Sequence, residues 1–419
     1  MRFAHVTTFY PPYAFGGDGI VVQRFARALA REGHDVTVVH DTDTFRLLGG
    51  EIQGPDPIAE RDSEGVRVVR VRGRPRVLSS LLTHQIGRPV LKAPGVREVL
   101  DEGGFDVVHF HNVSMIGGPG VLAYGGDAVR LYTAHEHWLV CPTHVLWKNR
   151  REPCDERACL RCTLIHRRPP QLYRYSGFME RQLRHVDVFF AQSEFSRRKH
   201  EAFGFRHEME VMAPFLPDSD APTEERRERR VGEAPTSPFV LFAGRLERMK
   251  GLDDILLVWG EEAPADLVVA GDGPHRARLE ALAAESTRVR FLGRIPNERV
   301  IELMREALAV LVPSTGYETF GFTAVEAFRA GTPVVARRRG PLPELVQKGG
   351  GLLFGTATEA RSAVRRLVEE PELRRRLGEA GRRAFEATWS EEVVVPRYIA
   401  RIERLLAERE PGAHDRADA

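Results

Sequence analysis

Two glutamates in one apolar stretch are the first candidates for chemistry. Residues 316–335 read GYETFGFTAVEAFRAGTPVV, and seven residues separate Glu318 from Glu326. Burying a carboxylate without a polar partner is costly, so a simple core would carry apolar side chains at both positions. Carboxylates accept hydrogen bonds from paired hydroxyls, which sugars and ribose both carry. The pair therefore indicates a hydroxyl-rich ligand, unless the glutamates only cap a helix or form salt bridges.

The residues around the glutamates predict a phosphate site between them. An apolar strand is expected to end near residue 314, and a helix to run over residues 321–330. Glu318 then precedes the helix and Glu326 lies on its second turn. Backbone N–H groups at a helix start bind phosphates, and here they belong to Phe320, Gly321 and Phe322. A nucleotide sugar, with its anionic centre and hydroxyls at both ends, fits this pattern.

A second anion-binding segment is GRLERMKG, which follows the apolar run FVLFA. Arg245 comes directly after the strand, and Lys250 precedes an expected helix. Two cations beside a helix N-terminus suit a diphosphate. Both residues could equally be ordinary solvated charges, so this segment is weak by itself.

The N-terminal half offers its own candidates at strand ends. Gly16 and Gly17 precede a helix and permit close approach to a phosphate or sugar, although a flexible turn has the same sequence. His135 lies just past the strand in LYTAHEHW, where a lone histidine is more often structural. His109 and His111, in VVHFHN, are further candidates for the cleft lining.

All the cysteines of the chain fall within one short segment. Cys141, Cys154, Cys159 and Cys162 lie directly after His135, and the last two form a Cys-x2-Cys pair. In a reducing compartment such a cluster suits tetrahedral Zn²⁺, while free thiols, an iron–sulfur cluster or disulfides remain open. We expect a structural zinc site in a lid over the acceptor pocket, at about residues 138–170.

The segment after the cysteines, LIHRRPPQLYRYSGFMERQLRH, is basic with interleaved aromatic residues. Such a segment can contact an anionic membrane surface or a lipid-linked acceptor, and a solvated helix face is an equally good interpretation. The N-terminus lacks a long apolar signal region, and no run of about 18 apolar residues is present. We therefore expect a cytoplasmic protein, with contact to the inner face of the membrane as a possibility.

Composition and length set the architecture that must position these residues. The 419-residue chain is 42% hydrophobic and 29% charged, with a net charge of +2, so its charge demands no nucleic-acid partner. Short apolar runs alternate with amphipathic stretches, the pattern of doubly wound α/β domains. The pattern restarts after a segment rich in proline and charge, at residues 214–238. We expect an acceptor domain over 1–215, a nucleotide-sugar domain over 216–388, and over 389–419 a helix that crosses back to the first domain, followed by a disordered tail.

The ordered set GRLERMKG, VVAGDGP, FLGRIP and PSTGYETFGFTAVEAFRAGTPVVA resembles the retaining GT-B glycosyltransferases with the Glu-x7-Glu signature, known as family 4. The likeness extends over nearly the whole chain. It implies two Rossmann-like domains facing across a cleft, and transfer of a hexose from a nucleoside diphosphate to a hydroxyl acceptor.

The resemblance also implies a role for each matching residue. Arg245 and Lys250 would bind the donor diphosphate, Glu318 the donor sugar and Glu326 the ribose. The main chain of Phe320, Gly321 and Phe322 would contact phosphate or sugar, with Gly16 and Gly17 closing over the donor. The main chain of Arg294 and Ile295 would border the nucleobase, and His135 would touch the sugar near the reacting carbon.

The implied reaction is a front-face displacement with retention, in which cations rather than a metal neutralise the diphosphate. We expect UDP or GDP in the donor, and a saccharide, a lipid-linked saccharide or a small natural product as acceptor. A sugar-nucleotide epimerase of the same fold would act without an acceptor. A non-catalytic binding protein would hold the nucleotide sugar without turnover.

Overall fold

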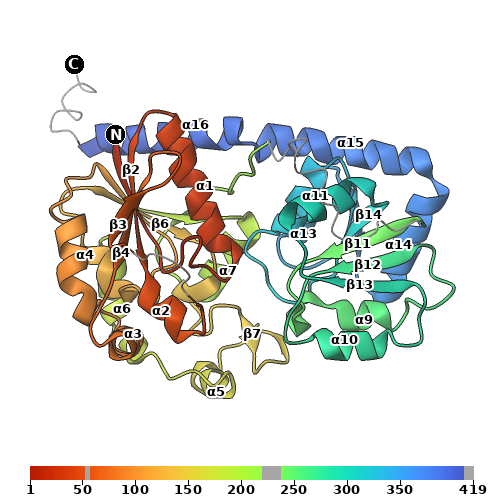
Figure 1. The fold of residues 1–419 in the computed structure, drawn as a ribbon, viewed down its shortest axis with the longest axis horizontal. Coiled ribbons are helices and arrows are strands. Elements are labelled where there is room, and N and C mark those ends of the chain that lie inside the picture. Colours follow the sequence, from red (N-terminus) through yellow and green to blue (C-terminus); the bar gives the residue numbers. More distant parts are fainter. Residues whose placement is uncertain (52–56, 219–236, 410–419) are drawn as a thin grey trace.

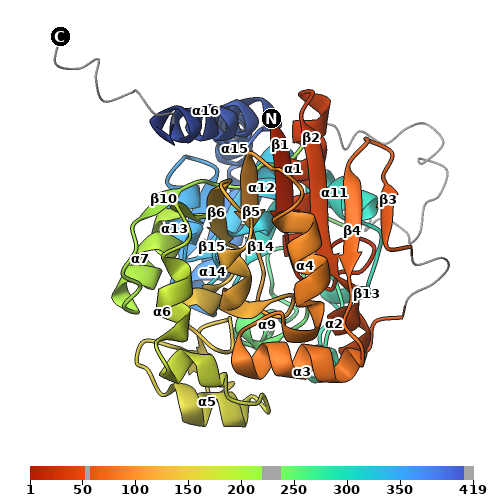
Figure 2. The same cartoon turned by 90° about the vertical axis from the view of Figure 1, so that its left-hand side faces the viewer.

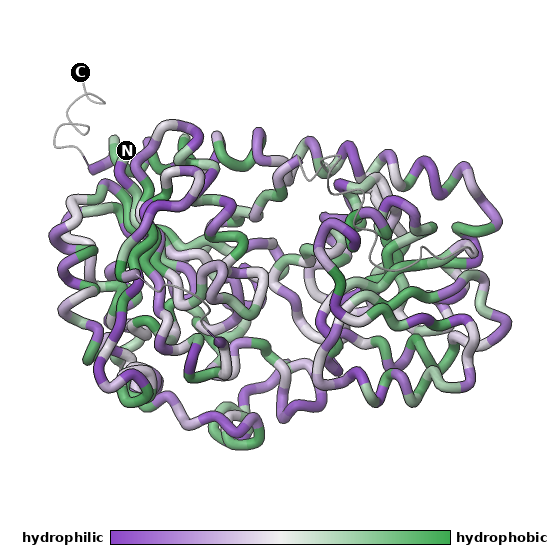
Figure 3. The backbone as a smooth tube through the Cα atoms, in the orientation of Figure 1, coloured by the Kyte–Doolittle hydropathy of each residue, from purple (hydrophilic) through white to green (hydrophobic). Residues whose placement is uncertain are grey.

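The computed structural model describes residues 1–51, 57–218 and 237–409, which form two domains side by side (Figure 1). Each domain has one sheet with a hydrophobic core on both faces. The strands form the apolar interior in Figure 3, as expected for a doubly wound fold. Most of the expected linker and the expected disordered tail fall on residues 219–236 and 410–419, outside the described residues.

The first sheet has eight strands in the order β10-β9-β6-β5-β1-β2-β4-β3. Neighbouring strands are parallel except β3, which runs antiparallel to β4 at one edge. Their carboxyl ends meet at one edge of the sheet, where ligands bind in open α/β folds. The bounds are β1 Arg2–Val6, β2 Asp35–Asp41, β3 Ala59–Arg61, β4 Arg67–Val71, β5 Val107–Phe110, β6 Val129–Ala134, β9 Val188–Ala191 and β10 Met209–Val211.

Helices cover both faces of the first sheet. Helix α1 buries an apolar stripe that includes Val22, Phe25 and Leu29, and a glycine with positive φ, Gly33, follows its end. The bounds are α1 Gly17–Arg31, α2 Thr42–Leu47, α3 Arg76–Ile86, α4 Ala93–Leu100, α6 Phe178–Leu183 and α7 Glu194–Ala202, with 3₁₀ turns at Val90–Lys92, Gly118–Ala123, His137–Leu139 and Leu172–Tyr175.

The cysteine-rich insert leaves the first domain after β6. It contains a small antiparallel pair, β7 Trp147–Lys148 and β8 Glu152–Pro153, followed by α5 Cys159–Ile165. Cys141, Leu146 and Cys154 of the insert form a small core with Phe203, which follows α7 of the first domain. The insert is therefore packed onto the first domain, at its lower margin in Figure 1.

The second sheet has six parallel strands in the order β13-β12-β11-β14-β15-β16. Its bounds are β11 Phe239–Ala243, β12 Asp266–Ala270, β13 Val289–Gly293, β14 Ala309–Val312, β15 Val334–Arg337 and β16 Gly351–Phe354. The helices are α9 Leu252–Leu256, α10 Arg276–Leu282, α11 Asn297–Glu306, α12 Phe322–Arg329, α13 Leu342–Val346, α14 Ala357–Glu369 and α15 Pro371–Thr388, with a 3₁₀ turn at Arg248–Lys250.

The last helix, α16 Glu391–Arg409, runs from the second domain over the first and packs against α1 (Figure 1). Tyr398 is fully buried there, and its hydroxyl lies 2.7 Å from His109 Nδ1. Val394, Val395, Ile402 and Leu405 join the same core. In the described part of the chain, no helix is both long enough and apolar enough to cross a bilayer.

Candidate active site

Lys250 and Glu318 meet at the carboxyl ends of two neighbouring strands, β11 and β14. Lys250 Nζ lies 2.8 Å from Glu318 Oε1, and the side chains are 29% and 16% exposed. Gly251 permits this approach: its φ is +72°, and an added Cβ would lie 2.2 Å from the carbonyl oxygen of Pro313. Two loops that are distant in sequence are thereby held in contact.

The pair is stabilised in its charged form. Burial alone would raise the pKa of Glu318, but Lys250 and the Ser314 hydroxyl, which donates at 2.5 Å, hold this pKa below its usual value. Burial would lower the pKa of Lys250, and the attraction of Glu318 raises it instead. The site therefore holds a carboxylate and an ammonium group at neutral pH.

The second glutamate lies on α12, as the sequence predicts. Gly321 precedes this helix with a φ of +106°, and Glu326 is half-buried on the second turn. Phe320 is buried in the core of the second domain. Phe322 packs against the cores of both domains, so the start of α12 lies at the junction between them.

The remaining candidates of the second domain line the same edge of its sheet. Arg245 follows β11, its side chain is 61% exposed, and its Nε lies 2.9 Å from Glu247. Arg294 and Ile295 follow β13; Arg294 is exposed, and Ile295 packs against the core. An anion bound by Arg245 would have to compete with Glu247 for the guanidinium group.

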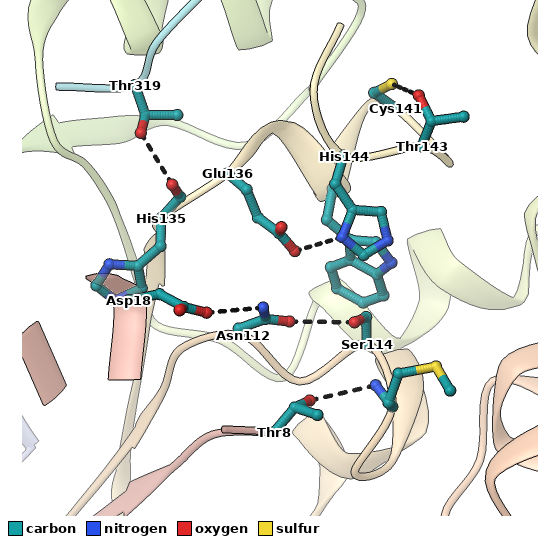
Figure 4. Close-up of polar contacts among 12 residues, drawn as sticks. Thr8, Asp18, Asn112, Ser114, His135, Glu136, Cys141, Thr143, His144 and Thr319 are labelled. Carbon is teal, nitrogen blue, oxygen red and sulfur yellow. Dashed lines mark hydrogen bonds and ion pairs between the residues drawn. The ribbon is translucent and has the colours of Figure 1, made fainter. Parts of the chain in front are cut away.

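His135 connects the two domains through its main chain and its side chain. The Thr319 hydroxyl, next to Glu318, lies 2.9 Å from the carbonyl oxygen of His135 (Figure 4). The same hydroxyl lies 3.1 Å from Gln192 Oε1, and Gln192 Nε2 lies 2.9 Å from His135 Nδ1. The loop that carries Glu318 thus contacts the imidazole of the first domain through one intervening side chain.

A line of histidines extends from His135 into the first domain. His135 Nε2 lies 2.9 Å from His111 Nδ1, and His111 Nε2 lies 2.9 Å from His5 Nδ1. Burial lowers the pKa of His135 to about 4 and that of His5 to about 3, and it holds the pKa of His111 well below its usual value. All three are neutral at pH 7. Because a neutral imidazole donates from one nitrogen and accepts with the other, the amide orientation of Gln192 sets the tautomer of the whole line.

The glycine loop of the first domain leads to the same histidine. Gly16 and Gly17 are exposed at the start of α1, which provides the N–H groups of a long helix. The next residue, Asp18, accepts a hydrogen bond of 3.0 Å from Asn112 and lies beside His135 (Figure 4). The first domain therefore brings a glycine loop, a carboxylate and a neutral imidazole to its sheet edge.

Two family models match this chain almost from end to end. Glycosyltransferase Family 4 matches residues 15–219, and Glycosyl transferases group 1 matches residues 223–384. The chain belongs to this family of glycosyltransferases. The glycosyltransferase family expected from the motifs is thereby confirmed. The expected GT-B fold is confirmed by the two parallel sheets and by the solved structures that match them. Retention of configuration and the role of the Glu-x7-Glu pair remain predictions.

Relatives and solved structures agree with this assignment. A glycogen synthase of Mycobacterium tuberculosis (strain CDC 1551 / Oshkosh) is 26% identical over 411 residues, covering 91% of this chain and 89% of the relative. A D-inositol 3-phosphate glycosyltransferase of Corynebacterium jeikeium is 37% identical over 182 residues, or 39% of this chain and 43% of that protein. The structure of sucrose-phosphate synthase from Thermosynechococcus elongatus matches with a TM-score of 0.73 and 20% identity, covering 97% of this chain and all of that one.

This glycosyltransferase carries site residues that the sequence analysis missed. Gln192 and Thr319 link the two domains, and neither was singled out. Gln192 directly follows β9, so a systematic search for polar residues at strand ends would have found it. Thr319 gave no such signal, because only the packing of the domains brings it to His135.

The histidine that differs most from its expected place is His109. It is 3% exposed, and its two ring nitrogens lie 2.7 Å from the Tyr398 hydroxyl and 2.8 Å from the Thr133 hydroxyl. The expectation that it lines the cleft is wrong, because α16 covers this position. His111 is 2% exposed and reaches the site only through His135.

The insert of this glycosyltransferase touches the Glu318 loop. The Tyr317 hydroxyl donates a hydrogen bond of 2.6 Å to Asp155, whose carboxylate also lies 2.8 Å from Lys199 Nζ. Burial and the nearby carboxylate raise the pKa of Tyr317 to about 12, so it remains a donor at physiological pH. Asp155 directly follows Cys154, which connects the cysteine cluster to the candidate site.

The four cysteines surround one small cavity of about 20 Å³, room for one water-sized particle. All are free thiols, and Cys141, Cys154 and Cys162 are buried. Burial and the neighbouring cysteines raise the pKa of Cys154 to about 11. Within the described residues, no three of the cysteine sulfurs all lie within 4.8 Å of one another. One nitrogen from each of His5, His109 and His111 does meet this criterion.

Proposed function

We propose that this protein transfers a hexosyl group from a nucleoside diphosphate sugar to a hydroxyl acceptor, with retention of the anomeric configuration. The observation that carries the proposal is the Lys250–Glu318 pair, placed beside Thr319 where the second domain contacts His135. It joins a cation for phosphate and a carboxylate for hydroxyls in one site, at the edge of two facing sheets.

The ion pair suggests how the site receives its donor. A diphosphate bound by Arg245 and Lys250 offers Lys250 a more highly charged partner than Glu318. Glu318 is then released to accept hydrogen bonds from the hydroxyls of the donor sugar. Glu326 would bind the ribose, the main chain at Arg294 and Ile295 would border the base, and Gly16 and Gly17 would close over the donor from the first domain.

The proposed step breaks two bonds and forms two. The bond between the anomeric carbon and the leaving phosphate oxygen breaks, and the acceptor oxygen bonds to this carbon on the same face. The acceptor proton passes to the leaving phosphate oxygen, so no external acid or oxidant is required. Arg245 and Lys250 stabilise the charge that develops on the diphosphate, and no catalytic metal is assigned.

Relatives and neighbours support UDP or GDP as the donor nucleotide. HepE of Anabaena has been solved in complex with UDP-glucose, at 17% identity and a TM-score of 0.64. A Corynebacterium glutamicum relative, 29% identical over 232 residues, is a GDP-mannose-dependent mannosyltransferase acting on a phosphatidylinositol monomannoside. The relatives include a glycogen synthase as well as this mannosyltransferase, so they indicate no single acceptor. We leave the acceptor class open among saccharides, lipid-linked saccharides and small molecules.

We also propose that Cys141, Cys154, Cys159 and Cys162 hold a structural Zn²⁺ in the insert. All four cysteines line one small cavity, and thiolates are preferred ligands of zinc. Binding would draw the four sulfurs closer together and deprotonate them. Elemental analysis of protein purified without added metal should find about one zinc per chain, and protein free of metal would overturn this assignment.

The proposed function is tested in two stages. Thermal unfolding is measured with UDP-glucose, GDP-mannose, ADP-glucose and dTDP-glucose; a donor at about 100 times its Kd adds about 2.7 kcal/mol of stability. The stabilising donor is then incubated with a panel of acceptors from all three classes, namely saccharides, lipid-linked saccharides and small-molecule alcohols, and the anomeric proton of the product is followed by NMR. An α-linked product from an α-linked donor supports the proposal. Inversion would overturn the retaining step, donor conversion without any acceptor would indicate an epimerase, and binding without turnover would indicate a binding protein.

A further inference from the structure

Helix α3 has its polarity reversed relative to an ordinary surface helix. Its buried residues are Ser79, Ser80 and Thr83, all at 0% exposure. Apart from Arg76 at its first position, its exposed residues are aliphatic: Val77, Leu78, Leu81 and Ile86 are between 43% and 55% exposed. A surface helix normally buries its apolar side chains and exposes polar ones. The outward face of α3 is therefore suited to an apolar environment.

Helix α5 of the insert repeats this reversal. It buries Cys162 and Thr163, while Leu160, Leu164 and Ile165 are exposed. The 3₁₀ turn that follows exposes Leu172 at 60% and Tyr175 at 64%. Most of the large exposed apolar side chains of the described residues thus belong to two short stretches, 77–90 and 160–175.

These stretches lie along one margin of the first domain. His84 on α3 lies 3.0 Å, through its Nε2, from the carbonyl oxygen of Pro169, and α3 contacts the turn at Leu172–Tyr175. Figures 1 and 2, which differ by a quarter turn, both place α3 and α5 at the lower margin. We call the exposed residues of 74–90 and 160–175 the basic apolar face.

The charged side chains of the basic apolar face are all positive. Residues 65–97 and 157–179 contain no Asp or Glu, although the chain as a whole is nearly neutral. Arg74, Arg88, Arg161 and Arg167 are exposed among the leucines. Arginines beside inserted aliphatic side chains are the composition of a surface that lies on anionic lipid, where each cation near the bilayer adds to binding.

We propose that the basic apolar face docks on an anionic lipid bilayer. A second copy of the chain is a poorer partner, because two such faces would bring arginines together without a carboxylate in either segment. Docked in this way, the first domain, with His135 at its sheet edge, lies at the membrane, while the second domain extends beside it (Figure 1). The proposal concerns location and stands independently of the transfer reaction.

Vesicle co-sedimentation of the full-length protein, without donor or acceptor, tests the proposal. We expect binding to vesicles of phosphatidylcholine with about one-third phosphatidylglycerol, weak binding to pure phosphatidylcholine, and loss of binding with rising salt. The double variant Leu78→Ser with Leu81→Ser should lower the partition coefficient at least about tenfold. Arg161→Glu with Arg167→Glu should lower it by a similar factor on anionic vesicles only.

The matched control is Val393→Ser, because Val393 is an exposed aliphatic residue of α16, which lies at the opposite, upper margin in Figures 1 and 2. It should bind like the unmodified protein, and all variants should retain the same unfolding temperature. Equal binding to neutral and anionic vesicles, or no vesicle binding at all, would overturn the proposal. So would a concentration-dependent dimer in sedimentation velocity that the Leu78 and Leu81 substitutions abolish, since it would assign the face to a second copy.

Discussion

Lys250 Nζ lies 2.8 Å from Glu318 Oε1, so the two charges proposed to bind opposite parts of the donor are paired with each other in the unliganded protein. Each keeps the other ionised inside a partly buried site. Donor binding is then an exchange of partners rather than the neutralisation of an isolated charge.

Replacing Lys250 should greatly reduce activity while leaving the protein folded. Lys250→Ala removes the cation for the diphosphate, so we expect kcat/KM to fall by about 100-fold or more. It also leaves Glu318 without its main partner, which should cost about 1–3 kcal/mol of unfolding free energy. Arg248→Ala is the matched control, because Arg248 is an exposed cation of the same 3₁₀ turn. Equal losses in both variants would contradict the assigned role of Lys250.

The Lys250–Glu318 ion pair should stabilise the folded protein only within a defined pH range. The pKa of Glu318 is lowered, so its contribution to stability is present above the usual value of 4.5 and is lost as the pH falls through the lowered pKa. The pKa of Lys250 is raised, so its contribution is present below 10.5 and is lost as the pH rises through the raised pKa. Chemical unfolding of Glu318→Gln should show the largest loss relative to wild type between these limits, with convergence of the two proteins at acid pH.

Because the protein buries neutral histidines, we expect its folding stability to fall on acidification already at pH values above those at which carboxylates become protonated. Burial lowers the pKa of His135 to about 4, whereas in the unfolded chain it is near 6.5. The unfolded state therefore binds more protons over this range, and stability falls as the pH is lowered from 6.5 to 4. In unfolding measurements, the destabilisation of His135→Gln should be largest at pH 7 and shrink toward pH 4. A constant difference across this range would show that His135 is not held neutral.

Gln192 controls the imidazole that faces the other domain. Gln192→Glu places a carboxylate 2.9 Å from His135 Nδ1, which favours the imidazolium form and should raise the pKa of His135. NMR titration of the ring would measure the shift, and the pH profile of kcat should move with it. Gln192→Met, which keeps the volume but removes the amide, should lower kcat without raising this pKa. An unchanged titration in Gln192→Glu would contradict the contact.

Tyr317 should couple the insert to the Glu318 loop. Tyr317→Phe removes the hydrogen bond to Asp155 and should cost about 1 kcal/mol of stability. Hydrogen exchange should speed up in the insert around Asp155 and in the loop around Glu318 together. Faster exchange in only one of these two segments would show that the Tyr317–Asp155 contact does not couple them.

Much of the fold could be predicted because its strands are buried on both faces and read as continuous apolar runs, such as DVTVVH and FVLFAGR. The helix expected over 321–330 is present as Phe322–Arg329. The strands β3 and β10 have no such apolar run, because they are three-residue edge strands with the sequences AER and MEV. Such strands are specified by their neighbours rather than by their own pattern.

Residues of the candidate site could be predicted only where the sequence immediately around them indicates a role. His135 directly follows β6, and Lys250 and Glu318 lie in the loops after β11 and β14, but the roles assigned to them remain predictions. The contacts of Thr319 with His135 and Gln192 join residues more than one hundred positions apart, which no local pattern records. The burial of His109 under Tyr398 has the same origin.

The position of α16 has a consequence for the order in which the protein matures. The core of the first domain includes Val394, Tyr398 and Ile402, residues from the end of the chain. On the ribosome, the N-terminal half emerges long before the helix that covers it, so its apolar surface over β1 and α1 has to wait for the completed polypeptide. We expect a fragment ending at residue 388 to be captured by chaperones or to aggregate, and a separately supplied α16 peptide to restore its solubility. The two domains are thus separate in architecture but interdependent in biogenesis.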